Sequence, residues 1–242
     1  MKSCPTSAVL GALLFLSTGT PLFDHFPYRS TVGAVQYLTN IRPDIAFIVN
    51  KLSQFLKAPT DVHWSTVKCV LRYLASTLDH GLTIKPDFNF NITAYSDADW
   101  ASGLDDRKST VAYYIYLGYT LISWSFKKQL TMARSSTQSE YKALAHAAVE
   151  ITWVRNLLSE IGFSSTGVPV LRCDNMGAGA LAANPVFHVR TKHIEIDVHF
   201  VWDLVLQGQL HVRYVPSIEQ LIDCLPRLFP TNGFLIFEAS SV

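Results

Sequence analysis

The order of regular segments after residue 90 restricts the fold of this chain more than any other feature of its sequence. Three strand-like runs come first, and a long helix, a strand, two helices, a strand and a last helix follow. The second and third runs, residues 111–117 and 120–126, are apolar and separated only by Gly118-Tyr119, so we expect a hairpin. A hairpin followed by alternating strands and helices predicts an α/β protein with helices packed on a mixed sheet.

Apolar spacing, capping residues and chain breakers give the expected boundaries of these segments. We expect strands at residues 92–97, 111–117, 120–126, 168–173 and 210–215, and helices at 136–162, 176–183, 191–207 and 218–229. Pro226 falls inside the last of these helices and would kink or end it.

The pattern before the sheet is helical. Ser30 is expected to cap a short helix, Pro43 to open a second one over residues 44–57, and Thr60 to cap a third. Residues 1–27 show no clear period. The sequence therefore predicts a small helical segment in front of the α/β part.

Composition is that of a folded protein and assigns no function. Hydrophobic residues make up 49% of the 242 residues, which fits one large domain or one domain plus a piece of another. The formal net charge of +1 neither favours nor excludes nucleic acid, because a carboxylate-rich site can cancel a basic face. The four cysteines are scattered singly without a C-x-x-C pair, so we expect no zinc site and a reduced, intracellular protein of the cytoplasm or nucleus.

An apolar run at residues 8–16 follows Lys2 and precedes small residues, in the order of a secretory signal. The alternatives, which we favour, are a segment that packs on the helices after it or an accident of where the reading frame begins. The run is shorter than the roughly 20 residues of a spanning helix, so no stable membrane partner is expected.

Four acidic residues stand at the edges of the predicted segments. Asp97 closes the first strand, Glu140 lies at the start of the long helix, Asp174 follows an apolar strand, and Asp223 lies in the last helix. Carboxylates gathered at the end of a sheet can bind the two Mg²⁺ ions that cut a phosphodiester. The sequence therefore predicts a metal site wherever these acids converge.

Each acid also has a purely structural interpretation. Asp97 could form a turn, Glu140 could complete a capping box with Thr137, and Asp174 could cap a helix in competition with Asn175. Asp223 could be a solvated charge, and Glu195 and Asp197 compete with it as a fourth ligand.

Two short cationic stretches could contact a nucleic-acid backbone. Lys127 and Lys128 end a strand, and Arg190, Lys192 and His193 belong to a loop that also contains His188. A solvated strand edge and a plain polar loop are the alternatives.

Several strings of this sequence resemble the ribonuclease H domain of copia-type LTR retrotransposon Pol polyproteins, in matching order along residues 91–225. The strings are Tyr95-Ser-Asp-Ala-Asp-Trp-Ala, Asp106-Arg-Lys-Ser-Thr110, Ile122-Ser-Trp, Lys127-Lys-Gln, Arg134-Ser-Ser-Thr-Gln-Ser-Glu-Tyr-Lys-Ala143, Cys173-Asp-Asn, Asn184-Pro-Val-Phe-His, Arg190-Thr-Lys-His-Ile-Glu-Ile196 and His199-Phe. Upstream, Tyr28-Arg-Ser-Thr-Val-Gly33, Arg42-Pro-Asp-Ile, His63-Trp and Leu71-Arg-Tyr-Leu resemble the C-terminal helical part of the same polyprotein's reverse transcriptase.

The resemblance implies a ribonuclease H-like fold, a mixed five-stranded sheet flanked by helices. It implies a reverse-transcriptase remnant at residues 28–85 and a ribonuclease H-like domain at 90–229, with 1–27 and 230–242 unassigned, in a chain that is a fragment of a larger polyprotein. The implied activity is endonucleolytic hydrolysis of the RNA strand of RNA–DNA hybrids with two Mg²⁺ ions, or Mn²⁺. The alternative is a non-catalytic nucleic-acid-binding module or a relic.

The matched strings place Asp97, Glu140 and Asp174 on the family's metal-binding acids. Asp223 follows Pro216-Ser-Ile-Glu-Gln-Leu221, where the resemblance implies the fourth acid. The sequence departs from the family at Cys224-Leu-Pro226 and at Trp202-Asp203, and it contains no Tyr-x-Asp-Asp.

Overall fold

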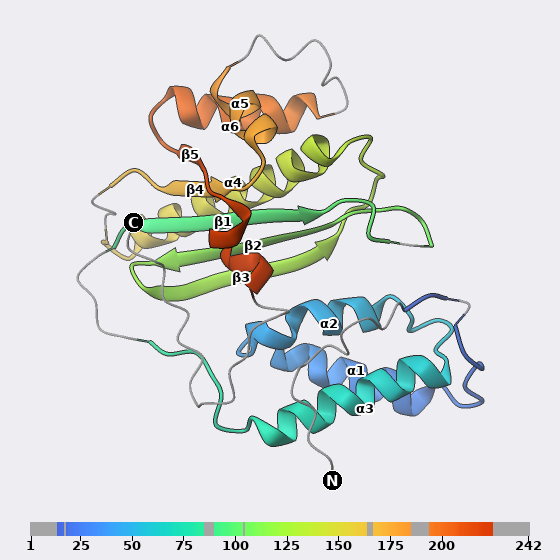
Figure 1. The fold of residues 1–242 in the computed structure, drawn as a ribbon. Helices are drawn as coiled ribbons and strands as arrows, with labels where there is room; N and C mark the ends of the chain where they lie inside the picture. Colours follow the sequence, from blue (N-terminus) through green and yellow to red (C-terminus); the bar gives the residue numbers. More distant parts are fainter. Residues whose placement is uncertain are drawn as a thin grey trace. The chain divides into compact units, whose positions relative to one another are not determined.

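The computed structural model describes residues 14–16, 18–84, 90–103, 105–163, 167–184 and 194–224. For residues 223 and 224 it describes the backbone alone. The described residues divide into two compact units, residues 14–83 with Cys224 and residues 84–223. The described part of the first unit is helical, and that of the second contains the sheet (Figure 1). Each unit has a hydrophobic core of its own.

The sheet of the second unit has five strands within the described residues, in the order β3-β2-β1-β4-β5. Its strands are β1 (Ile92–Asp99), β2 (Thr110–Leu117), β3 (Thr120–Lys128), β4 (Val170–Cys173) and β5 (His211–Tyr214). The first three strands pair antiparallel, whereas β4 pairs parallel with β1 and β5 with β4. The predicted hairpin and the predicted mixed, ribonuclease H-like sheet are thereby confirmed.

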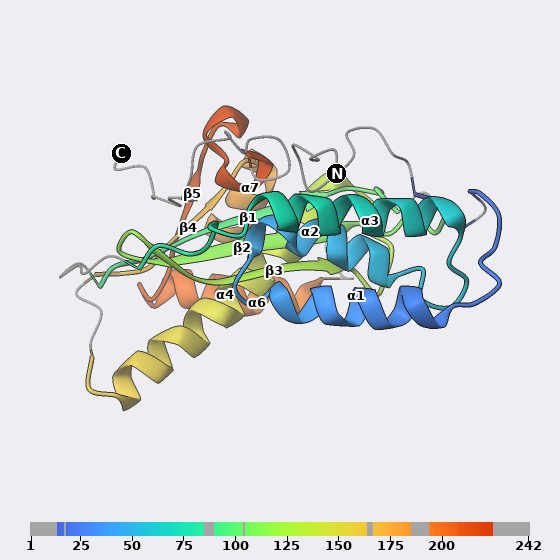
Figure 2. The ribbon, with the colours of Figure 1, turned by 90° about the horizontal axis from the view of Figure 1, so that it is seen from below.

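Side-chain alternation in the strands gives the sheet one face for the helices. Ile92 and Ala94 of β1 and Ile115 of β2 join Leu144 of the long helix and Leu171 of β4 in one buried cluster. The helices of this unit are α4 (Ser136–Glu160), α5 (Met176–Ala183) and α6 (Glu195–Leu206). A short 3₁₀ turn, η2 (Ser217–Glu219), and α7 (Leu221–Cys224) follow β5. Viewed from below, α4 and α7 lie on opposite faces of the sheet (Figure 2).

The described helices of the first unit are α1 (Phe26–Leu38), α2 (Pro43–Ser53) and α3 (Asp61–Ser76). Thr60 caps α3 as predicted, because its side chain accepts from the His63 N–H while its own N–H donates to His63 Nδ1 at 3.0 Å. The small helical segment expected in front of the sheet is thus confirmed. Its core is built from residues such as Tyr28, Ile45 and Val70.

A buried ion pair at the start of α2 is hydrogen-bonded to the end of α3. Arg42 donates to both carboxylate oxygens of Asp44, at 2.9 and 2.6 Å, and to the backbone oxygen of Thr77 at 2.9 Å. Tyr73 donates to the same carboxylate at 2.9 Å. Burial works to lower the pKa of Arg42, but the hydrogen bond and charge of Asp44 outweigh it and raise that pKa. The network satisfies groups that would otherwise be costly to bury.

Some predicted boundaries in the first unit were wrong. The first helix begins at Phe26 and not after Ser30, because Pro27 takes a first-turn position and opens the helix earlier. The second helix ends at Ser53, four residues before the expected end, since the chain leaves it for the turn before Pro59. Cys69 takes part in a disulfide bond, contrary to the expectation that all cysteines are reduced. Spacing along the sequence does not show which cysteines meet in space.

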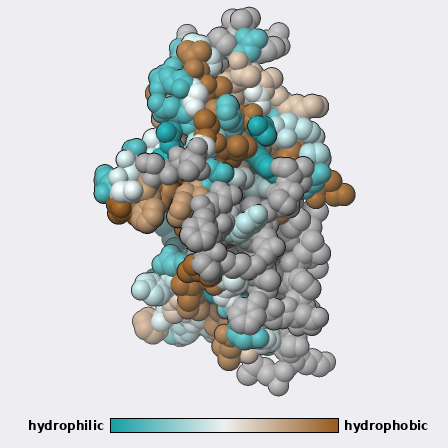
Figure 3. Space-filling view, turned by 90° about the vertical axis from the view of Figure 1, so that its left-hand side faces the viewer, coloured by the Kyte–Doolittle hydropathy of each residue, from teal (hydrophilic) through white to brown (hydrophobic). Residues whose placement is uncertain are grey.

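In the part of the chain that the structure describes, no helix is both long and apolar enough to cross a membrane. The apolar run at residues 8–16 lies outside the described residues up to residue 13, and Leu14 is buried in the helical core. On the face drawn in Figure 3, hydrophobic side chains occur in small groups between hydrophilic ones over the described surface.

Candidate metal centre

Carboxylates from distant parts of the sequence meet at one edge of the sheet, the edge formed by the C-terminal ends of the parallel strands β1 and β4. Among the described residues, Asp97, Glu140 and Asp174 each offer a ligand atom, and these atoms lie within 4.8 Å of one another. Asp97 and Asp174 come together because β1 and β4 are parallel neighbours whose last paired residues are Ser96 and Cys173. The next residue on each strand is an acid, so both carboxylates stand at the same edge. The predicted convergence is confirmed for these three of the four acids.

Glu140 reaches this edge from the second turn of α4. The predicted capping box of Thr137 and Glu140 is wrong, because Ser135 is the cap and accepts from the Gln138 N–H at 3.2 Å. Gln138 in turn accepts from the Arg134 N–H at 2.8 Å. The helix start therefore does not need the Glu140 carboxylate, which is 7% exposed and directed to the cluster.

Asp174 likewise does not cap a helix. Asn175 caps α5 and accepts from the Ala178 N–H at 3.0 Å. Asp174 Oδ2 instead accepts a hydrogen bond from Ser217 Oγ at 2.9 Å. Gly177 allows α5 to begin close to α4, since a Cβ there would lie 3.1 Å from Thr137 Cγ2.

The chemistry of the donor set fits a hard divalent cation. The cluster offers only carboxylate oxygens, which Mg²⁺, Mn²⁺ and Ca²⁺ prefer over nitrogen or sulfur. Carboxylates this close repel one another, and a bound cation relieves that repulsion. Burial, followed by the charges of Glu140 and Asp174, raises the pKa of the Cys173 thiol to about 11. Cys173 is not a member of the carboxylate group.

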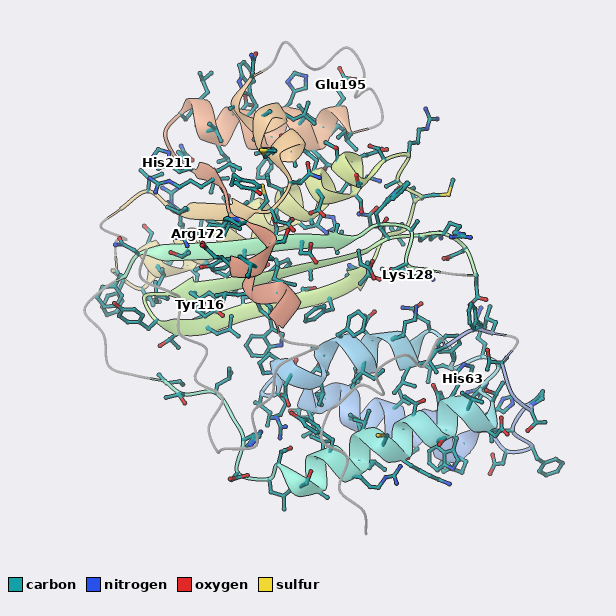
Figure 4. All side chains as sticks on the ribbon, in the orientation of Figure 1. His63, Tyr116, Lys128, Arg172, Glu195 and His211 are labelled. Carbon is teal, nitrogen blue, oxygen red and sulfur yellow. The ribbon has the colours of Figure 1, made fainter. Side chains whose placement is uncertain are left out.

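The other predicted ligands are not part of this cluster or cannot be placed. Asp223 lies in α7, but its side chain is outside the described part of the structure. Glu195 and Asp197 occupy the first turn of α6 and are not in the group. Glu195 is exposed at the start of that helix (Figure 4).

The cationic residues expected to contact nucleic acid have different settings. Lys127 is exposed on edge strand β3, and Lys128 at its end pairs with Asp106 at 2.9 Å (Figure 4). Arg190, Lys192 and His193 lie outside the described residues.

The sequence did not predict two contacts to the carboxylate cluster and its neighbours, both made by residues of the segment after β5. Ser217 contacts Asp174, and Gln220, which is fully buried, donates from Nε2 to the backbone oxygen of Ser96 at 3.0 Å. In the sequence, the string that contains both residues indicates only the place of Asp223. No local pattern in the sequence reveals either contact, because both depend on residues that are distant along the chain.

An arginine packs on an aromatic ring at the opposite side of β1 from α4. Arg172 Nη1 donates to the Tyr95 hydroxyl at 3.2 Å, and its guanidinium lies 5.6 Å from the centre of that ring. These two residues are paired in the β1–β4 register. The contact links β1, which contains Asp97, to β4, which Asp174 follows.

Similar sequences occur in the polyproteins of mobile elements. The chain is 47% identical over 237 residues to the retrovirus-related Pol polyprotein from transposon RE2 of Arabidopsis thaliana, which covers 98% of this chain and 16% of that protein. It is 35% identical over 209 residues to the corresponding polyprotein from transposon TNT 1-94 of Nicotiana tabacum, covering 86% of this chain and 16% of that protein. The chain thus spans about a sixth of the length of these relatives.

A shorter relative is the secreted RxLR effector protein 161 of Plasmopara viticola. It is 46% identical over 129 residues, which cover 53% of this chain and 91% of that protein. No protein-family model matches the chain.

Among solved structures, LC11-RNase H1, isolated from compost, is similar to this chain with a TM-score of 0.44 and 13% identity, over 56% of this chain and 92% of that one. The foamy viral protease-reverse transcriptase in complex with an RNA/DNA hybrid has a TM-score of 0.46 and 11% identity. The match covers 84% of this chain and 26% of that one.

Proposed function

Since the chain belongs to the family of retrovirus-related Pol polyproteins from transposons, we propose that its second unit is a ribonuclease H that cuts the RNA strand of RNA–DNA hybrids. The observation that carries this proposal is the meeting of Asp97, Glu140 and Asp174 at the carboxyl edge of β1 and β4. Two Mg²⁺ ions, or Mn²⁺, are the proposed cofactors. The helical first unit is proposed to be the C-terminal remnant of a reverse transcriptase.

The chain's own residues have three tasks in this proposal. Asp97, Glu140 and Asp174 hold the metal, with Asp223 as the fourth ligand assigned by its place in the sequence. Bound metal would lower the pKa of the attacking water and stabilise the leaving 3′ oxygen. Partial burial of the cluster keeps the carboxylates in a medium where their charge acts strongly on a cation.

The hybrid is proposed to be held through its backbone. Lys127, Lys128, Arg190, Lys192 and His193 are the candidate phosphate contacts. Recognition of the 2′-hydroxyl along the minor groove would distinguish the RNA strand from the DNA strand.

The test uses the full chain and an end-labelled RNA–DNA hybrid, with Mg²⁺ or with EDTA. We expect cutting of the RNA strand in Mg²⁺ only, and a loss of at least about 100-fold in Asp97→Asn, the size typical of losing one group that stabilises the transition state. Asp99→Asn is the matched control, because Asp99 is an exposed acid of the same strand outside the cluster.

Cutting by Asp97→Asn at the wild-type rate would refute the assignment of the site. Metal-independent binding of the hybrid without any cutting would instead support the non-catalytic alternative.

A further inference from the structure

The segment after β5 crosses from one ligand-bearing strand to the other. The Val215 N–H donates to the backbone oxygen of Cys173 at 2.9 Å, which prolongs the β4–β5 pairing by one bond. Pro216 then ends the strand, and the chain turns through η2. We call residues 216–220 the crossing turn.

The crossing turn makes one contact to each strand of the carboxylate cluster. Ser217 Oγ donates to Asp174 Oδ2 at 2.9 Å, directly after β4. Gln220 Nε2 donates to the backbone oxygen of Ser96 at 3.0 Å, one residue before Asp97 on β1. A single short segment therefore touches the surroundings of both aspartates.

The Gln220 contact fixes the position of the turn. Gln220 and Ser96 are both fully buried, and a buried amide that loses its hydrogen bond is strongly unfavourable, because no water replaces the lost partner. The turn is also closed internally, because the Glu219 N–H donates to the Pro216 oxygen at 2.8 Å and the Gln220 N–H to the Ser217 oxygen at 3.2 Å. An anchored, internally bonded turn leaves the exposed Ser217 hydroxyl little freedom to move away from Asp174.

We propose that Ser217 is a positioning residue of the metal site, which fixes the orientation of the Asp174 carboxylate, and that Gln220 anchors the turn that carries it. This inference rests on the proposed function, since it assigns a role within the same site. Its physical basis is that a hydroxyl donor both restricts the rotation of Asp174 and offsets the repulsion from Asp97 and Glu140. Partners of metal ligands commonly change metal affinity by 10- to 100-fold when removed.

The test measures Mn²⁺ binding to the full chain by isothermal titration calorimetry, without substrate. Because the Ser217 bond is exposed, we expect the low end of that range: about tenfold weaker binding in Ser217→Ala. Ser217→Thr keeps the hydroxyl and should restore binding. Ser159→Ala, an exposed serine in the last turn of α4, should bind Mn²⁺ as the wild type does.

Two further measurements separate positioning from a general structural effect. Thermal unfolding in EDTA should be nearly unchanged in Ser217→Ala, and hybrid cutting should need about tenfold more metal while approaching the wild-type rate at saturation. Unchanged Mn²⁺ affinity in Ser217→Ala, or an equal loss in Ser217→Thr, would overturn the inference.

The outcomes also distinguish this inference from the proposed function. A wild-type chain that binds Mn²⁺ through Asp97 but never cuts the hybrid would end the nuclease proposal and leave the role of Ser217 intact. A wild-type chain that binds no Mn²⁺ would overturn both.

Discussion

At the scale of single residues, the Glu140 carboxylate lowers the stability of the metal-free fold but is expected to increase the affinity of the site for a cation. Its side chain is almost fully buried beside the carboxylates of Asp97 and Asp174. Without a cation, this arrangement costs stability, because the buried charge is close to two like charges. With a cation, the same arrangement supplies binding energy.

Glu140→Gln should therefore have opposite effects in EDTA and in metal. We expect a higher unfolding temperature than wild type in EDTA, since the amide removes the repulsion, and at least tenfold weaker Mn²⁺ binding, so that saturating metal stabilises the variant less. Thermal unfolding in EDTA and in a series of Mn²⁺ concentrations measures both effects. Glu160→Gln at the exposed end of α4 should change neither, and a destabilised Glu140→Gln in EDTA would contradict this explanation.

Asp61 at the start of α3 makes the helical unit sensitive to acid. Its Oδ1 accepts from the Thr20 N–H at 2.8 Å and from the Val62 N–H at 2.9 Å. The Thr20 hydrogen bond is the largest cause that lowers the pKa of Asp61. A lowered pKa means that the contribution to stability is fully present above the usual value of about 3.9 and is lost as pH falls through the folded value.

Asp61→Asn should consequently flatten the acid limb of the stability curve of this unit. Urea unfolding between about pH 2 and pH 6 measures the slope, followed by the fluorescence of Trp64 in a background whose other four tryptophans are replaced by phenylalanine. Asp79→Asn, an exposed acid of the same unit, is the control and should keep the wild-type slope. An acid limb in Asp61→Asn as steep as that of the wild type would show that Asp61 does not couple to folding.

At the scale of elements, α4 has a buried first part and a more exposed second part. Leu144 is fully buried against the sheet, whereas Leu157 is 41% exposed. Leu144→Ala should lower the free energy of unfolding by about 2–5 kcal/mol, because it leaves a cavity between α4 and the strands. Leu157→Ala removes the same atoms from the same helix and should cost less than about 1 kcal/mol. Urea unfolding of both variants measures the difference, and equal losses would contradict the packing of α4 on the sheet.

Elements whose ends depend on nearby residues were predictable from the sequence. The range of α5, Met176–Ala183, agrees with the expected one, because Asn175 caps it and the backbone becomes extended at Asn184. The cap of α4 was not predictable, since Ser135-x-x-Gln138 and Thr137-x-x-Glu140 both fit the same pattern. The buried position of Glu140 in the fold decides between them.

Elements whose ends depend on distant residues were predicted less well. The last helix begins at Leu221 and not at residue 218, because the preceding turn is held by the bond from Gln220 to Ser96, 124 residues away. The aspartates of the site were predictable for a topological reason: both follow strands that a parallel pairing brings together. The Ser217 contact was not, since no local pattern relates Ser217 to Asp174.

At the scale of the whole molecule, each unit has a core that can be perturbed on its own. Ile45 belongs to the core of the helical unit and Ile115 to that of the sheet unit, and both are fully buried. Separate cores allow separate opening reactions, each with its own free energy. A core substitution should then loosen mainly the unit that contains it.

Hydrogen exchange of the full chain tests this division. Ile45→Ala should remove about 2–5 kcal/mol from its own unit and speed exchange in residues 26–76, while residues 92–128 keep their wild-type protection. Ile115→Ala should give the reverse pattern. If either variant sped exchange equally in both ranges, the two units would open as one cooperative body, and the carboxylate cluster would depend for its stability on the helical unit as well as on its own sheet.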